Sequence, residues 1–150
     1  MENYPEESGL KERVNYSGDD AVVTIIKVCV EKLDLYINEF NKVDYIKLDA
    51  EGAEFAILQG GIATIKKHRP IISIEFGGTG YGPYGVQQTE LYDFCDSIGY
   101  FITDIFGNLI PTRDAWAEIC DTASWDYFLV PREKIRFFWT SVHGMDDNMQ

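Results

Sequence analysis

The sequence predicts an α/β fold with a mostly parallel sheet and flanking helices, and three observations support it. Short apolar runs alternate with longer stretches of helical periodicity. Within residues 43–76, a helical stretch closing on Lys-Lys-His-Arg-Pro separates two such runs, and this order is typical of a parallel crossover. Both apolar runs end on carboxylates, and ligands bind at that edge of open α/β sheets.

The amino-terminal half is expected to hold two strands and two helices. Residues 22–30 (VVTIIKVCV) are rich in β-branched side chains and predict a strand. Residues 33–40 carry apolar side chains at i, i+4 and i+7, which indicates a short amphipathic helix. A second strand is expected at residues 43–48 and a longer helix at residues 53–68.

Gly60 and Gly61 lie inside the helix expected at residues 53–68. A glycine there costs about 1 kcal/mol relative to alanine, so the pair needs a structural reason. Close packing on the sheet, or a break in the helix, would supply one. Pro70 ends the helix, because the residue before a proline avoids the α region.

The carboxyl-terminal half continues the alternation. A buried strand is expected at residues 71–76, a glycine-rich loop at 77–85 and a helix at 88–98. A strand at 100–106, an irregular stretch at 107–124 with a short helix near 115–120, and a last strand at 125–130 follow. The chain is expected to divide into a polar segment (1–20), one domain (21–131) and a tail (132–150).

Composition limits the classes of partner. The 150 residues suffice for one hydrophobic core. The formal charge of −12 disfavours nucleic acid and anionic membrane surfaces, both of which need clustered Lys and Arg. Neither a secretory leader nor an apolar run long enough to span a bilayer is evident. Cys29, Cys95 and Cys120 lack metal-binding spacing and are interpreted as buried, reduced thiols of a cytoplasmic protein.

Acidic residues gather where the two apolar runs within residues 43–76 end. Asp49, Glu51 and Glu54 surround Gly52, and Glu75 follows the second run. With a period of two, Lys47 and Asp49 share one face of their strand, so Lys47 is expected to pair with Asp49 or Glu75. No metal-ligand cluster is evident.

Several motifs resemble the FkbM family of S-adenosylmethionine-dependent methyltransferases over about residues 22–131. They are the block IKLDAEGAE (46–54), then LQG (58–60), HRP (68–70) and IE (74–75), with VCVEKLD (28–34) upstream and WDYFL (125–129) downstream. The resemblance implies a partial Rossmann-like methyltransferase fold. It also implies S-adenosylmethionine as cofactor and O-methyl transfer to a small molecule: a sugar, lipid or natural-product hydroxyl.

The resemblance also implies roles for individual residues. Asp49 is the first candidate for a general base and Glu51 the second. Glu54, Glu75, Gly77 and Gly78 are expected at the edge of the pocket for substrate and cofactor. The alternative is that Glu51 and Glu54 only favour the positive amino end of the following helix.

The family's glycine-rich cofactor loop, which belongs to its first strands, has no counterpart before the acidic block. The chain therefore resembles the carboxyl half of a methyltransferase. Either residues 22–30, a second chain or a missing amino-terminal half is expected to complete the sheet. A catalytically inactive binding domain with the same fold is the alternative reading, and an unrelated α/β binding domain is a third. The glycines of residues 77–82 are out of register with a cofactor loop and indicate a lid or substrate loop.

Overall fold

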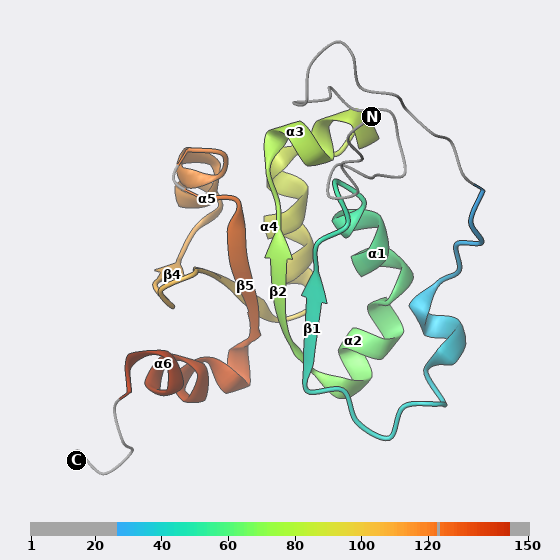
Figure 1. The fold of residues 1–150 in the computed structure, drawn as a ribbon. Coiled ribbons are helices and arrows are strands. Elements are labelled where there is room, and N and C mark those ends of the chain that lie inside the picture. Colours follow the sequence, from blue (N-terminus) through green and yellow to red (C-terminus); the bar gives the residue numbers. More distant parts are fainter. Residues whose placement is uncertain (1–26, 123, 145–150) are drawn as a thin grey trace, which may run out of the picture.

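A computed structural model of the protein describes residues 27–122 and 124–144. At its centre is a five-stranded sheet with the order β1-β2-β5-β3-β4 (Figure 1). The strands are β1 (Tyr45–Leu48), β2 (Ile71–Glu75), β3 (Tyr100–Asp104), β4 (Leu109–Ile110) and β5 (Asp126–Pro131). The α/β class is therefore confirmed.

The expectation of a mostly parallel sheet is wrong. Only one pair of neighbouring strands, β1 and β2, is parallel, whereas β5 runs antiparallel to both β2 and β3, and β4 runs antiparallel to β3. The reason is a tight turn after β3, where Gly107 has a φ of 82° and the Asp104 carboxylate accepts bonds from the amides of Phe106 and Asn108. This turn makes a hairpin with β4 in place of a helical crossover. The chain then returns between β2 and β3 as β5, in the opposite direction.

The crossover from β1 to β2 is as predicted. Tyr45 lies opposite Ile71 and Leu48 opposite Ile74 in a parallel register. Two short helices, α1 (Glu54–Gly60) and α2 (Ile62–His68), occupy the stretch expected to be one helix, and they lie beside β1 (Figure 1). The helix breaks at Gly61, where a Cβ would lie 3.2 Å from Leu33 Cδ2. The break in the helix therefore accounts for the glycine pair, whereas the expected packing on the sheet is wrong, because Gly60 and Gly61 pack against Lys32 and Leu33.

The segment before β1 differs from expectation. Residues 27–30 are exposed and form no strand, and residues 22–26 of the expected strand lie outside the described residues. The helix expected at 33–40 is a single 3₁₀ turn, η2 (Leu33–Tyr36). Its Asp34 carboxylate accepts bonds from the amides of Ala63 and Thr64 at 2.9 and 2.8 Å. These two bonds tie η2 to the start of α2. They satisfy amides of the first turn that the N-cap residue, Gly61, cannot reach, since it has no side chain.

The later described elements, apart from the strands, are helices and 3₁₀ turns. Helix α4 (Gln88–Ser97) and β3 follow the prediction, and Gly99 between them has a φ of 72°. The expected glycine-rich loop is helical instead, with α3 (Gly78–Tyr81) running into the 3₁₀ turn η3 (Gly82–Tyr84). The short helix of the irregular stretch is α5 (Arg113–Ile119). After β5 come η4 (Arg132–Lys134) and α6 (Ile135–His143).

The two faces of the sheet differ. One face buries a single cluster of apolar side chains under α1, α2, α4 and α5; its sheet members include Leu48, Ile72, Ile74, Ile102, Tyr127 and Leu129. The other face carries Tyr45, Lys47, Ser73, Glu75 and Phe128, none of them buried. Helix α6 covers part of it, with the Phe138 ring 5.1 Å from that of Phe128. The β1–β2 part of this face stays open in the described chain.

Two further expectations meet mixed outcomes. Cys95 and Cys120 are buried free thiols, and burial raises the pKa of the Cys120 thiol to about 12. Cys29 is exposed, so the expectation of burial is wrong for this residue. None of the helices in the described chain is long and apolar enough to cross a bilayer. The division at residues 20/21 and 131/132 stays a prediction.

Arg69 joins three elements at the end of α2, and we expect its removal to destabilise the fold. Its guanidinium bonds both carboxylate oxygens of Glu133 at 2.8 Å and also the carbonyls of Ile98 and Gly99. Arg69→Ala removes these four hydrogen bonds and is expected to lower the free energy of unfolding by about 2 kcal/mol in urea titrations. Arg113→Ala breaks an exposed pair with Asp93 and is the matched control, expected to cost less than about 1 kcal/mol. Equal losses in the two variants would contradict the prediction.

Candidate functional site

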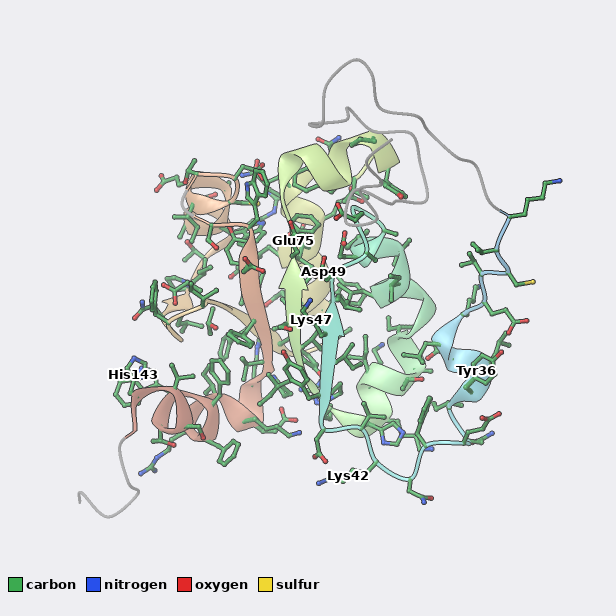
Figure 2. The ribbon with its side chains drawn as sticks, viewed as in Figure 1. Tyr36, Lys42, Lys47, Asp49, Glu75 and His143 are labelled. Atoms are coloured by element: carbon green, nitrogen blue, oxygen red, sulfur yellow. The ribbon has the colours of Figure 1, made fainter. Side chains whose placement is uncertain are left out.

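The candidate site lies where β1 and β2 end, on the open face of the sheet. Residues 49–53, here called the acidic loop, lead from β1 into α1. Because β1 and β2 are parallel, Asp49 and Glu75 come to the same edge, as predicted (Figure 2). Lys47 points toward both from the middle of β1.

Asp49 forms an ion pair with Lys47. The Lys47 Nζ lies 2.5 Å from Asp49 Oδ2, so the expected pairing of Lys47 is confirmed. The hydrogen bond from Lys47 holds the pKa of Asp49 below its usual value, against the opposing effect of burial. Asp49 is exposed and is therefore a charged group open to solvent at this edge.

Glu75 behaves in the opposite way. Burial raises the pKa of Glu75, and the hydrogen bond with Asp49 and the negative charges of Asp49, Asp126 and Glu54 raise it further. Two carboxyl groups in contact do not both ionise readily. The arrangement therefore favours one proton on the pair, held by Glu75, with Asp49 charged against Lys47.

A cavity of about 270 Å³ opens beside this pair. Its lining runs from the charged side chains at the ends of β1 and β2 to apolar side chains of β5 and the β3–β4 turn; it comprises Lys47, Leu48, Asp49, Ser73, Ile74, Glu75, Ile105, Asp126, Tyr127 and Phe128. A small polar molecule with an apolar part would fit such a lining.

Glu51 and Glu54 lie in the same loop and have different surroundings. Glu51 is half-buried, its backbone is left-handed with a φ of 56°, and it lines a second, small hollow. Glu54 is only 3% exposed, and its Oε1 accepts bonds from the amides of Ala50 and Gly52. The carboxyl group of Glu54 is thus turned toward the backbone of the loop and away from the larger cavity.

Gly77 and Gly78 pack against the protein itself. A Cβ on Gly77 would lie 2.8 Å from the ring of Trp125, and one on Gly78 would lie 3.1 Å from the carboxylate of Asp121. Asp121 also accepts bonds from the amide of Gly78 and the hydroxyl of Tyr81. Gly77 and Gly78 therefore do not offer their backbone to the close approach of a nucleotide cofactor.

Asp126, Trp125 and Asp121 belong to the site and were missed by sequence reasoning. Asp126 pairs with Glu75 across the antiparallel register of β2 and β5. The missed signal is the direction of β5, because an antiparallel strand brings its amino end to the edge where β1 and β2 end. Within the described residues, no group of three or more His, Cys, Asp or Glu side chains is arranged to hold a metal ion.

Comparisons with known proteins give one match. The family model described as Methyltransferase FkbM domain matches residues 2–102, which is two thirds of the chain. It starts earlier and ends earlier than the stretch that carries the sequence resemblance. No curated protein and no solved structure matches the chain.

The raised pKa of Glu75 leads to a pH-dependent prediction. Its folded pKa lies above the unfolded value of about 4.3, so the folded state binds more protons and stability falls as pH rises through the folded pKa. Glu75→Gln removes that fall, and its stability relative to the wild type is expected to increase with pH above about 4.3. Urea unfolding at a series of pH values measures it.

The exposed Glu118 supplies the control for this series. Glu118→Gln is expected to leave the pH profile of the wild type unchanged. If Glu75→Gln follows the same profile as the wild type, Glu75 does not hold the proton of the pair.

Proposed function

The chain belongs to the FkbM methyltransferase domain family, and from this premise we propose that it takes part in O-methyl transfer to a small-molecule hydroxyl. The acceptor class is a sugar, a lipid or a natural product. S-adenosylmethionine is the proposed methyl donor, because the family's methyl transfer uses it. The match also confirms the family resemblance seen in the motifs around Asp49.

The observation that carries the proposal is the position of Asp49. Methyl transfer from a sulfonium requires the acceptor oxygen to be held in line, and a nearby base helps a hydroxyl to react. Asp49 is exposed beside the larger cavity, and Lys47 keeps its carboxylate charged. In the proposal, Asp49 accepts the proton of the hydroxyl. Glu51 is the second candidate, since it lies in the same loop.

We further propose that the described residues form only part of the cofactor site. Gly77, Gly78 and Gly80 lie against other parts of the chain, so the cradle that would approach the cofactor has to come from elsewhere. The outer edge of β1 has no partner strand in the described sheet. A second chain or an amino-terminal half of the same protein would complete the sheet there, since an open strand edge favours pairing.

A catalytically inactive binding domain is the second candidate function. The packing of Gly77, Gly78 and Gly80 against other parts of the chain favours it, since it leaves no room for a cofactor at these glycines. A domain that has lost its cofactor still keeps the fold and the acidic edge. A cytoplasmic location and the exclusion of nucleic acid and membrane surfaces remain part of the proposal, supported by the charge of −12 and the free thiols.

The first prediction here concerns the cofactor. Titration of the 150-residue chain with S-adenosylmethionine in a calorimeter is expected to show weak binding or none, since Gly77, Gly78 and Gly80 pack against other parts of the chain. A micromolar dissociation constant would overturn this, and it would direct attention back to residues 77–82. The same titration, repeated on a preparation in which a second chain or an amino-terminal half completes the sheet, separates the two candidate functions. The enzyme needs the cofactor and should bind it, whereas the inactive binding domain does not need it.

The second prediction concerns catalysis in a preparation that transfers methyl groups. Asp49→Asn keeps the size of the side chain and removes the base, so the single-turnover rate is expected to fall by about 10² or more. The melting temperature is expected to change little, since Asp49 is exposed.

Asp44→Asn is the matched control for this measurement. Asp44 is also exposed and also pairs with a lysine, Lys42, but it directly precedes β1 and so lies at the other end of the strand from Asp49. Its replacement is expected to leave the rate unchanged. An unchanged rate in Asp49→Asn would remove Asp49 from the mechanism and make Glu51 the next residue to test.

A further inference from the structure

One residue of the acidic loop, Glu51, has a backbone conformation that its side chain disfavours, while the neighbouring Gly52 adopts a positive φ readily. Glu51 has a φ of 56° and Gly52 a φ of 101°. A left-handed conformation costs a residue with a Cβ roughly 1 kcal/mol, and such strain persists only where the surroundings hold it. Something nearby must therefore hold the loop in this shape.

Glu54 supplies two of the bonds that hold it. One oxygen of Glu54 accepts the amide of Ala50 at 2.6 Å and the amide of Gly52 at 3.1 Å. These two amides lie on either side of Glu51, and the first belongs to the peptide that joins Asp49 to Ala50. The carboxyl group is thus bound to the loop at both ends of its turn.

An ordinary helix-capping role does not account for this geometry. Glu54 is the first residue of α1 and accepts the amides of Ala50 and Gly52, which precede the N-cap, whereas a capping-box glutamate lies at the third helical position and bonds the N-cap amide. The N-cap residue, Ala53, makes no capping bond with its side chain. Glu54 is also 3% exposed, so its carboxyl group meets the loop and not the solvent.

A second contact limits the loop from the other side. A Cβ on Gly52 would lie 2.2 Å from the carbonyl oxygen of Gly80, so α3 packs directly on the backbone of the loop. Helix α3 is itself fixed through the bonds from Gly78 and Tyr81 to Asp121. Between Glu54 and α3, the loop has little room to change its shape.

We propose that Glu54 is a positioning residue, whose buried carboxyl group holds the backbone of residues 50–52 and so keeps the Asp49 side chain against Lys47 and Glu75. The structural part of this proposal stands by itself, and only its consequence for catalysis by Asp49 rests on the proposed function. It assigns Glu54 a role through Asp49, and it places no contact between Glu54 and a substrate.

The experiment compares Glu54→Ala with Glu54→Gln by amide hydrogen exchange and by NMR titration of the Asp49 carboxyl group. Alanine removes the acceptor, so exchange at Ala50 and Gly52 is expected to speed up by about tenfold or more. The pKa of Asp49 is expected to move up toward its ordinary value, as the contact with Lys47 loosens. Glutamine keeps an acceptor oxygen and is expected to stay close to the wild type in both readouts.

Asp34→Ala is the matched control. Asp34 accepts two backbone amides at the start of α2, so its loss removes a comparable set of bonds away from the acidic loop. It is expected to leave the exchange at Ala50 and Gly52 and the titration of Asp49 unchanged. If Glu54→Ala does not fold, Glu54→Asp takes its place, since the shorter side chain draws the acceptor back from the loop.

Two results would overturn the proposal. One is wild-type exchange at Ala50 and Gly52 together with wild-type titration of Asp49 in Glu54→Ala. The other is an equal change in Asp34→Ala, which would mean a general loss of stability. Neither readout needs a methyl acceptor or a cofactor, so a failure of the positioning role is distinguishable from a failure of methyl transfer as the function.

Discussion

The parallel pairing of β1 with β2 is the constraint on which the rest of the site depends. It brings the carboxyl groups of Asp49 and Glu75 to one edge, close enough for each to affect the pKa of the other. There the hydrogen bond from Lys47 lowers the pKa of Asp49, while burial, and after it the neighbouring Asp49, raises the pKa of Glu75. The direction of β5 adds Asp126 beside them.

Sequence patterns predicted this unit because its signals are local. The period of two along β1 predicted that Lys47 would face Asp49, and the apolar runs on either side of a helical stretch predicted the parallel crossover. The family motif directed attention to Asp49 for the same reason, since it lies within one short block. Whether Asp49 and Glu51 act in catalysis stays a prediction.

The remaining parts depend on contacts between residues far apart in the chain, and local patterns carry little information about these. The hairpin at Gly107 reversed the direction of the later strands, and no helix separated β3 from β4. The glycines at 77 and 78 resembled a loop open to ligands, yet Trp125 and Asp121 lie against them. The positioning role proposed for Glu54 was not predicted either, because a carboxylate at the start of a helix has an ordinary explanation in the helix dipole.

The insertion of β5 between β2 and β3 has a consequence for the order of folding. Both neighbours of β5 are complete long before it in the chain, and neither contacts the other in the sheet. During synthesis, β1 with β2 and β3 with β4 can form as two separate pieces, because each pair is close in sequence. The central strand joins them only after it has emerged from the ribosome. Until then, two strand edges with buried apolar side chains remain open, and this interval is when the chain is most exposed to aggregation.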